Sequence, residues 1–370
     1  MYRLSDQSEI SLPFRLGEQE VGYSLGDFEI KTNSALEYRW SNNENEFQLR
    51  EAYLMWYPSW GEVKVGKQIH AWGAVDGNNP TDNLNPYDYY YMFLPGAERK
   101  VGTVSGSLKY YWNDWQFEGV FIPEHEGNRF PFGETAFPLD FPMSAPELMD
   151  EERGSEFGFR IQTTLGSSDL SLSYFDGRDR SFSYVGITNS MPSFFYRNTS
   201  VLGFDLVSFI GDFTNRFEIG YFSTENDAES DMKTLNDASY IQFTGQVEYS
   251  TENDIMFSLQ IIGSEISEIN GTMTKDEFQH GMGTPFASFT DLGLSFSLSA
   301  NYLDDALELM GNTFIDLKDS QSMLGVSAKY SPMDNWKLNL SISKFMGEEG
   351  TQFYEMEDFS HLKVGLEYHF

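Results

Sequence analysis

The stretch SHLKVGLEYHF, Ser360 to Phe370, alternates in polarity up to its last position. Every second residue from Leu362 to Phe370 is apolar, and the residues between them are polar or glycine. A period of two places the apolar residues on one face of an extended chain, whereas a helix would need a period near 3.6. The stretch is therefore predicted to be a β-strand with one apolar face and one polar face.

The same alternation recurs through the chain. It is clearest in YIQFTGQVEYS (240–250), DLGLSFSLSA (291–300) and NWKLNLSISK (335–344). The second face of these strands is too polar for a dry sandwich core and too regular for loops. A soluble antiparallel sheet also has one apolar face, so the pattern alone leaves both a sandwich and a membrane barrel open.

The lengths of the links between strands favour the barrel. Tight turns are predicted at 24–28, 57–61, 112–115, 165–170, 210–215, 249–255, 300–306 and 331–336, and long links at 70–98, 123–155, 176–196, 223–237, 263–283 and 347–359. Short and long links nearly alternate, which is typical of outer-membrane barrels with periplasmic turns and long extracellular loops. We expect an all-β fold over residues 1–370, a single closed antiparallel transmembrane β-barrel of about 18 strands, with 16 strands as the fallback. In this count MYRLS (1–5) is a possible short strand at the start of the sequence.

Composition narrows the class of function. Asp and Glu outnumber Lys and Arg by 57 to 24, for a formal charge of −33, which argues against a nucleic-acid partner. The absence of cysteine excludes thiol catalysis and thiolate metal sites. No apolar run is long enough for a transmembrane helix. The aromatic content of 16% suits the aromatic girdles of a membrane barrel.

The predicted surroundings follow from this location. We expect the outward rows to contact outer-membrane lipid, and the acidic long links to lie beside lipopolysaccharide, where Ca²⁺ or Mg²⁺ could bind loosely through oxygen ligands. No specific metal site and no cofactor are predicted, because no stretch has EF-hand spacing. The terminal Phe370, with Tyr368 before it, is similar to the signal that the barrel-assembly machinery recognises during biogenesis. Formation of a homo-oligomer stays open.

One segment stands apart from the rest. Leu49 to Phe93 reads LREAYLMWYPSWGEVKVGKQIHAWGAVDGNNPTDNLNPYDYYYMF. After two strands it contains glycines, prolines and repeated Asn and Asp, which favour ordered turns over a floppy loop. We predict an inward-folded constriction loop over residues 70–97.

Three parts of this segment carry a resemblance. LREAYL, VKVGKQIHAWG and DGNNPTDNLNPYDY are similar to a poorly characterised group of Gram-negative outer-membrane barrels, related in style to substrate-selective porins and to the alginate-export barrel. Some members of this group are associated with efflux or lipid-trafficking systems. The resemblance implies an outer-membrane location, no settled substrate and no enzymatic activity.

Inward-facing residues follow from strand parity, if the apolar row faces lipid. The candidates for the lumen or the constriction are Lys64, Gln68, His70, Trp72, Asp76, Asp82, Asp88, Lys109, Glu118, Arg160, Glu218 and Glu248, with Lys329, Lys337, Lys363 and Glu367 on further strands. Charge inside a barrel requires water or a counter-charge. Because both signs occur, two interpretations stay open: ion pairs that hold the barrel's shape, or a transverse field that orients a solute.

Motifs for catalysis are absent from the sequence. The five histidines are scattered, and none has the i, i+4 spacing with Glu that zinc hydrolases use. There is no G-x-S-x-G elbow, P-loop or dinucleotide fingerprint. We expect a protein that is not an enzyme, although parity leaves open a spatial pair such as His280 with a loop aspartate.

The predicted function is a porin-like outer-membrane channel for passive diffusion of small solutes. The alternatives are an outer-membrane partner of an export or lipid-trafficking system, a structural surface barrel with a plugged lumen, and, last, a soluble sugar-binding β-protein. The first alternative predicts an apolar path inside the barrel, and the second predicts a blocked lumen.

Overall fold

The computed structural model describes the whole chain except residues 41–42, 95, 140, 150–153, 229–231, 234–236, 271–272 and 286–289. Parts of the predicted acidic loops, at 150–153, 229–231 and 234–236, therefore lie outside the described residues.

Eighteen antiparallel strands form one sheet, which confirms the predicted fold class and strand number. They are β1 (Tyr2–Arg3), β2 (Phe14–Leu25), β3 (Phe28–Arg39), β4 (Glu44–Trp56), β5 (Gly61–Gln68), β6 (Thr103–Trp112), β7 (Trp115–Ile122), β8 (Glu156–Leu165), β9 (Ser168–Arg178), β12 (Asn198–Ile210), β13 (Phe213–Glu225), β15 (Asp237–Ser250), β16 (Ile255–Asn270), β17 (Leu292–Tyr302), β18 (Leu307–Asp316), β19 (Gln321–Met333), β20 (Trp336–Gly347) and β21 (His361–Tyr368). From β2 to β21 each strand pairs with the next in chain order, and the two-residue β1 pairs with β21.

The remaining elements lie in the long links. A three-stranded sheet combines β10 (Ser183–Thr188), β11 (Met191–Phe195) and β14 (Met232–Lys233). The helical pieces are short: α1 (Gln352–Glu355) and the 3₁₀ turns η1 (Tyr89–Tyr91), η2 (Gly96–Arg99), η3 (Lys275–Glu277) and η5 (Glu357–Phe359). Among the described residues, no helix combines the length and apolarity needed to cross a membrane.

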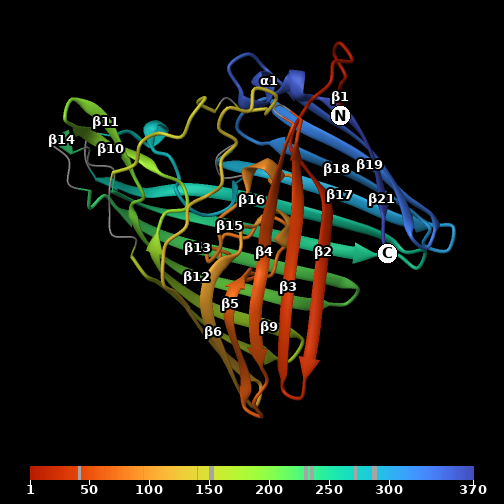
Figure 1. Ribbon diagram of the computed structural model, residues 1–370, viewed down its shortest axis with the longest axis horizontal. Coiled ribbons are helices and arrows are strands. Elements are labelled where there is room, and N and C mark those ends of the chain that lie inside the picture. The colour runs from red at the N-terminus through yellow and green to blue at the C-terminus, as the bar shows by residue number, and fades with distance from the viewer. Residues whose placement is uncertain are drawn as a thin grey trace.

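Turns and long loops lie at opposite ends of the strands, as the link lengths predict. Figure 1 shows the β2–β3 turn at the lower end of the molecule, and α1 and the β10–β11 hairpin at the upper end. Two-residue hairpin turns need a positive φ at their first central residue, which glycine and asparagine tolerate. Gly26 (φ 60°) in the β2–β3 turn and Asn113 (φ 52°) in the β6–β7 turn supply it.

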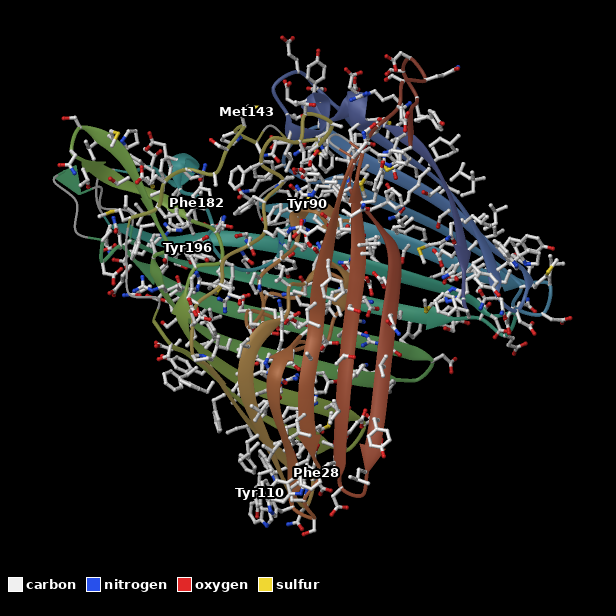
Figure 2. All side chains as sticks on the ribbon, in the orientation of Figure 1. Phe28, Tyr90, Tyr110, Met143, Phe182 and Tyr196 are labelled. Atoms are coloured by element: carbon white, nitrogen blue, oxygen red, sulfur yellow. The ribbon has the colours of Figure 1, made fainter. Side chains whose placement is uncertain are left out.

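The outer face of the sheet is apolar. Leu366 and Leu338 are 66% and 43% exposed, and no second sheet covers them. Aromatic rings gather at the turn end, where Phe28 stacks on Trp56 with 6.2 Å between ring centroids and Trp60 lies beside Tyr110. Figure 2 places Phe28 and Tyr110 at this end of the strands. An exposed apolar belt with an aromatic rim is what a barrel presents to lipid.

The interior differs from end to end. Toward the long loops, inward-facing apolar side chains form two buried clusters with loop residues; one contains Trp72, Phe222 and Tyr240, and the other contains Phe314, Phe345 and Phe353. Toward the turns, the inward row is polar. The expectation of a polar inward row along whole strands therefore fails in the loop half of the barrel, because the long loops fold inward and supply an apolar surface for the wall to pack against.

A charged substitution in the outward row tests whether that row contacts lipid. Leu298 lies near the middle of β17, outside the barrel, next to Phe257 and Gly311 on the neighbouring strands. Leu298→Arg should reduce folding stability in lipid vesicles by about 2–4 kcal/mol, because an arginine near the bilayer centre loses its hydration. Urea titration of the refolded protein measures the loss.

The control is the adjacent inward position. Ser297 faces Ser258 and Asn312 across the strand pairs, so Ser297→Arg should cost much less than Leu298→Arg. Equal losses for the two variants would contradict the assignment of the faces.

Candidate functional site

The link between β5 and β6, residues 69–102, crosses the interior of the barrel. It leaves β5 and reaches β13, β15 and β16, with β6, β7, β8, β9 and β12 lying between β5 and β13 in the sheet. Its path is fixed by hydrogen bonds to wall residues at its tip, its middle and its base. We call it the crossing loop.

The carboxylate of Glu218, fully buried on β13, holds the tip of the crossing loop. Oε1 accepts the backbone N–H groups of Ala74 and Val75, the latter at 2.7 Å, and Oε2 accepts the Thr81 hydroxyl at 2.8 Å. The Asn79 amide adds a bond of 3.0 Å to Oε1. These donors are all neutral groups of one loop, so Glu218 recognises the fold of the loop rather than a counter-charge.

The sequence of the tip suits this contact. A Cβ on Gly73 (φ 96°) would lie 2.5 Å from the Glu218 Oε1 atom, so only glycine lets the backbone approach the carboxylate this closely. Beyond it, the Asp76 backbone N–H donates to Gln246 at 2.8 Å, and Gln260 donates to the Asp76 carbonyl at 2.6 Å. The GAVD segment is thereby attached to three consecutive strands.

The base of the crossing loop is held by hydrogen bonds between Asn85, within the loop, and residues at the two ends of the loop. The Asn85 side chain accepts the His70 backbone N–H at 2.6 Å and donates to the carbonyls of Gln68 and Val101, both at 3.0 Å. The His70 ring lies 3.0 Å from the Ser105 hydroxyl. Asn85 thus ties the two ends of the crossing loop together.

Arg180 holds the middle of the loop. Its guanidinium donates to the carbonyls of Asn83 and Leu84, at 3.2 and 3.1 Å, and pairs with the Glu156 carboxylate at 2.7 Å. His125 contacts the same carboxylate at 2.8 Å. Burial lowers the pKa of His125, although its hydrogen bond to Glu156 opposes the shift. A bidentate guanidinium between a carboxylate and two carbonyls fixes this crossing in orientation.

A third buried carboxylate lies nearer the loop end of the barrel. Glu37 on β3 is fully buried and accepts Arg129 at 2.7 Å and the Tyr91 hydroxyl at 2.8 Å. Arg129 also reaches Asp88 at 2.9 Å. Burial raises the pKa of Asp88, and Arg129 beside it acts in the opposite direction.

Closer to the turns the lumen carries paired charges of both signs. Arg160 binds Asp205 at 3.0 Å, and Arg216 binds Glu248 at 3.1 Å. Lys109 lies 3.9 Å from Glu62. The Lys64 ammonium lies 5.0 Å from the centre of the Tyr53 ring, and the Trp72 indole donates to Glu118 at 3.2 Å.

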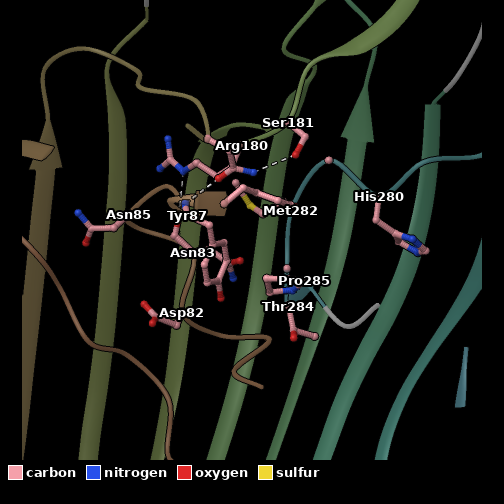
Figure 3. A pocket seen from close by; sticks show the side chains of 14 residues that line it. Asp82, Asn83, Asn85, Tyr87, Arg180, Ser181, His280, Met282, Thr284 and Pro285 are labelled. Carbon is pink, nitrogen blue, oxygen red and sulfur yellow. Dashed lines mark hydrogen bonds between the residues drawn. The ribbon is translucent and has the colours of Figure 1, made fainter. Parts of the chain in front are cut away.

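A small polar recess of about 20 Å³ lies between the crossing loop and residues 280–285. Figure 3 shows Asp82 and Tyr87 on one side of it and Met282 and Thr284 on the other, with Arg180 at its upper edge. The Tyr87 hydroxyl and Asp82 Oδ1 are buried without a hydrogen-bond partner. The recess therefore has room for about one water molecule, with which these two groups can form hydrogen bonds.

The structure places every nominated residue on the inner side of the barrel or in the crossing loop. Four of them lie at or beside the contact between Glu218 and the tip of the crossing loop, which we call the clamp. Glu218 and Asp76 belong to the clamp, and Trp72 and Glu118 form a hydrogen bond beside it. Sequence parity missed Arg180, Glu156, Glu37 and Arg129. Arg180 and Arg129 lie in links, where parity says nothing, and the buried Glu37 lies on a strand whose alternation a bulge interrupts.

Loosely bound cations stay a prediction. Among the residues that the structure describes, no group of three or more His, Cys, Asp or Glu side chains is arranged to hold a metal ion.

Solved structures share this fold, whereas no protein-family model and no curated protein sequence matches the chain. The chain is similar to OccK9 (OpdG) of Pseudomonas aeruginosa, with a TM-score of 0.53 and 10% identity over 94% of this chain and 87% of that one. A BenF-like porin from Pseudomonas fluorescens Pf-5 gives 0.51 and 12% over 89% and 84%. Wzi of Escherichia coli, described as a carbohydrate-binding β-barrel involved in Group 1 capsule assembly, gives 0.53 and 10% over 98% and 80%.

These likenesses show the fold, which is that of outer-membrane porin barrels. The outward rows add the physical reason for the location, because a continuous apolar belt is stable only against lipid. The protein is an integral protein of the bacterial outer membrane.

Substitution of Glu218 tests whether its carboxylate holds the crossing loop on the wall. Glu218→Ala leaves several buried N–H and O–H donors without an acceptor, at about 1–3 kcal/mol for each that stays unsatisfied. The crossing loop should then leave the wall and become cleavable by protease between Trp72 and Phe93. The matched control is Asp205→Ala, which removes a buried carboxylate on the neighbouring strand β12 whose hydrogen bonds go to Arg160 and Ser171 of the wall. Equal protection of the loop in wild type and Glu218→Ala would contradict the clamp.

Acid should loosen the loop that carries His280. Burial, and then the Arg197 charge, lower the pKa of His280 to about 4, while Asp291 acts weakly the other way. Between about pH 6.5 and 4 the unfolded segment binds a proton that the folded one does not, so its folded arrangement loses stability as the pH falls.

Hydrogen exchange of residues 279–285, corrected for intrinsic rates, measures this. Protection should fall on acidification, and the fall should be smaller in His280→Gln. The same pH dependence in both proteins would rule out His280 as its source.

Proposed function

We propose that the protein is a porin-like channel that lets small polar solutes diffuse across the outer membrane, and that the crossing loop is its constriction. The observation that carries this proposal is the clamp of the loop tip on Glu218 of β13, which five strands of the wall separate from β5, where the loop departs. A loop fixed at both sides of a lumen narrows the path without needing a separate plug domain.

The lumen on the turn side supports a polar solute. Lys109, Arg216 and Glu248 have side chains 28%, 28% and 12% exposed. Charges of both signs there are in contact with water rather than sealed in a dry core. Passage would depend on size at the crossing loop and on the field of these charges, with no energy input.

An export or lipid-trafficking role fits less well. That role needs an apolar path, and the inward row near the turns carries residues such as Ser258, Ser297 and Arg216. The apolar clusters lie only in the loop half and are packed with loop side chains.

A surface barrel with a plugged lumen is the second candidate, and these same clusters favour it. Trp72 and Leu84 of the crossing loop pack with Phe278 and Met282 of the link after β16, so two loops share one buried core inside the barrel. Wzi, to which the chain is similar, is described as carbohydrate-binding, and a plugged barrel here could bind saccharide at its loop end.

Conductance in planar bilayers separates the two candidates. The proteins to compare are the wild type, a deletion of residues 72–93, and Glu218→Ala. If the crossing loop is the constriction, the deletion and Glu218→Ala both raise single-channel conductance, and Asp205→Ala, at a buried wall carboxylate, changes it little. If neither wild type nor the deletion conducts, the channel proposal is wrong and the plugged barrel is favoured.

A further inference from the structure

Two glycines open a groove in the lipid-facing side of the wall. Gly106 on β6 pairs with Phe121 of β7, and Gly119 on β7 pairs with Leu108 of β6, so the two glycines are diagonal neighbours in the sheet. Both belong to the outward row, because their partners Leu108 and Phe121 are 46% and 43% exposed. A Cβ at either glycine would meet no atom within 4 Å. The backbone of the two strands is therefore bare on the side of the lipid.

Large outward side chains surround this bare backbone. Val65 on β5 and Phe159 on β8 lie on either side of it, and the rings of Phe121 and Phe157 pack with 5.2 Å between their centroids. The resulting groove holds about 550 Å³, and we call it the wall groove. It is continuous with the apolar belt of the outer face, so hydrocarbon is the chemistry that fills it.

A lysine lies on the same outward face at the loop end of the wall groove. Lys67 pairs with Val104, which is 55% exposed, two residues beyond the pair of Val65 and Gly106. The Cγ atom of Lys67 lies 3.4 Å from the place of a Cβ on Gly102, which precedes β6 on the side of the loops. The register thus places Lys67 outside the barrel, and its stem leans toward the loop end.

This outward lysine lacks a counter-charge in the protein. The inward lysines Lys64 and Lys109 both lie near the Glu62 carboxylate, at 3.8 and 3.9 Å. Among the described residues, no carboxylate forms such an ion pair with Lys67. A charged side chain in a lipid-facing row is costly, and a lysine lowers the cost by extending its ammonium to the polar interface. The remaining source of an anion at that interface is the head group of a lipid.

The position of Lys67 selects the kind of lipid. The loop end of the wall lies in the outer leaflet, because the long loops of outer-membrane barrels are extracellular. The lipopolysaccharide of that leaflet carries phosphate groups directly beside several acyl chains. The chain has a formal charge of −33, so general electrostatic attraction does not hold such an anion to it. A specific contact is needed, with an ammonium for the phosphate and a groove for an acyl chain.

We propose that the wall groove is a binding site for the lipid A part of lipopolysaccharide, with one acyl chain lying over Gly106 and Gly119 and one phosphate on the Lys67 ammonium. The contact gives the lysine its missing counter-charge and covers the bare backbone. This site is independent of the channel proposal, because it lies on the outer side of the wall and not in the lumen.

Native mass spectrometry of the detergent-purified full chain, titrated with purified lipid A, tests the proposal. The wild type should retain a bound lipid A molecule. Lys67→Gln removes the charge and Gly119→Leu fills the groove, and each should weaken the affinity about tenfold. Lys67→Arg should keep the affinity, because a guanidinium also binds phosphate.

The matched controls lie on strands away from the wall groove. Lys344 is an exposed lysine of β20 that pairs with Leu324 of the outward row. Gly311 on β18 pairs with the outward Val326 and has open space at its Cβ. Lys344→Gln and Gly311→Leu should leave the affinity unchanged. Equal losses in these controls and in the two groove variants would overturn the proposal, and so would unchanged affinity in both groove variants.

Further probes separate other occupants of the groove. Dephosphorylated lipid A should bind the wild type about tenfold more weakly than lipid A does, and equal binding of the two would overturn the contact with Lys67. Phosphatidylglycerol has a phosphate and acyl chains, and binding as tight as that of lipid A would overturn the assignment to lipopolysaccharide. A wild-type dimer that Gly119→Leu dissociates would show a second copy of the chain in the groove, which also overturns the proposal.

Discussion

The structure depends on one constraint: a backbone that crosses hydrocarbon must pair all its N–H and C=O groups within the protein. Long antiparallel strands, each bonded to the next along the chain, meet this constraint around nearly the whole wall. The alternation of side chains then follows from the pleat, with residues such as Leu338 outside and Asn339 inside.

Inside the barrel, buried carboxylates hold the inward-folded loops in place. Glu218, Glu156 and Glu37 are each buried, and each holds a different part of the inward-folded chain, either directly or through an arginine. The strongly acidic composition is thus not only a surface property. A carboxylate that accepts several N–H groups fixes a loop more firmly than a neutral acceptor would, and this explains how a loop rich in glycine and asparagine can stay ordered across a lumen.

Much of the wall can be predicted from sequence, because strand parity and link length are local properties. The alternation in SHLKVGLEYHF gives β21, and the tight links give all the turns. The interior is harder. Phe222 and Tyr240 face inward, but each is followed or preceded by an apolar residue of the outward row, Ile241 or Tyr221, so no period distinguishes them. The partners of Glu218 and Arg180 lie more than a hundred and nearly a hundred residues away in sequence, respectively, and only the folded path of the crossing loop brings them together.

The assignment of the two faces supports every later step, and spin labels test it most directly. Val326 is outward and 54% exposed on β19, and Ser327 is the next residue, facing inward. A nitroxide at Val326→Cys in lipid should collide often with oxygen and rarely with a water-soluble nickel complex, and one at Ser327→Cys should show the opposite preference. The same preference at both positions, or the reverse order, would contradict the barrel described here.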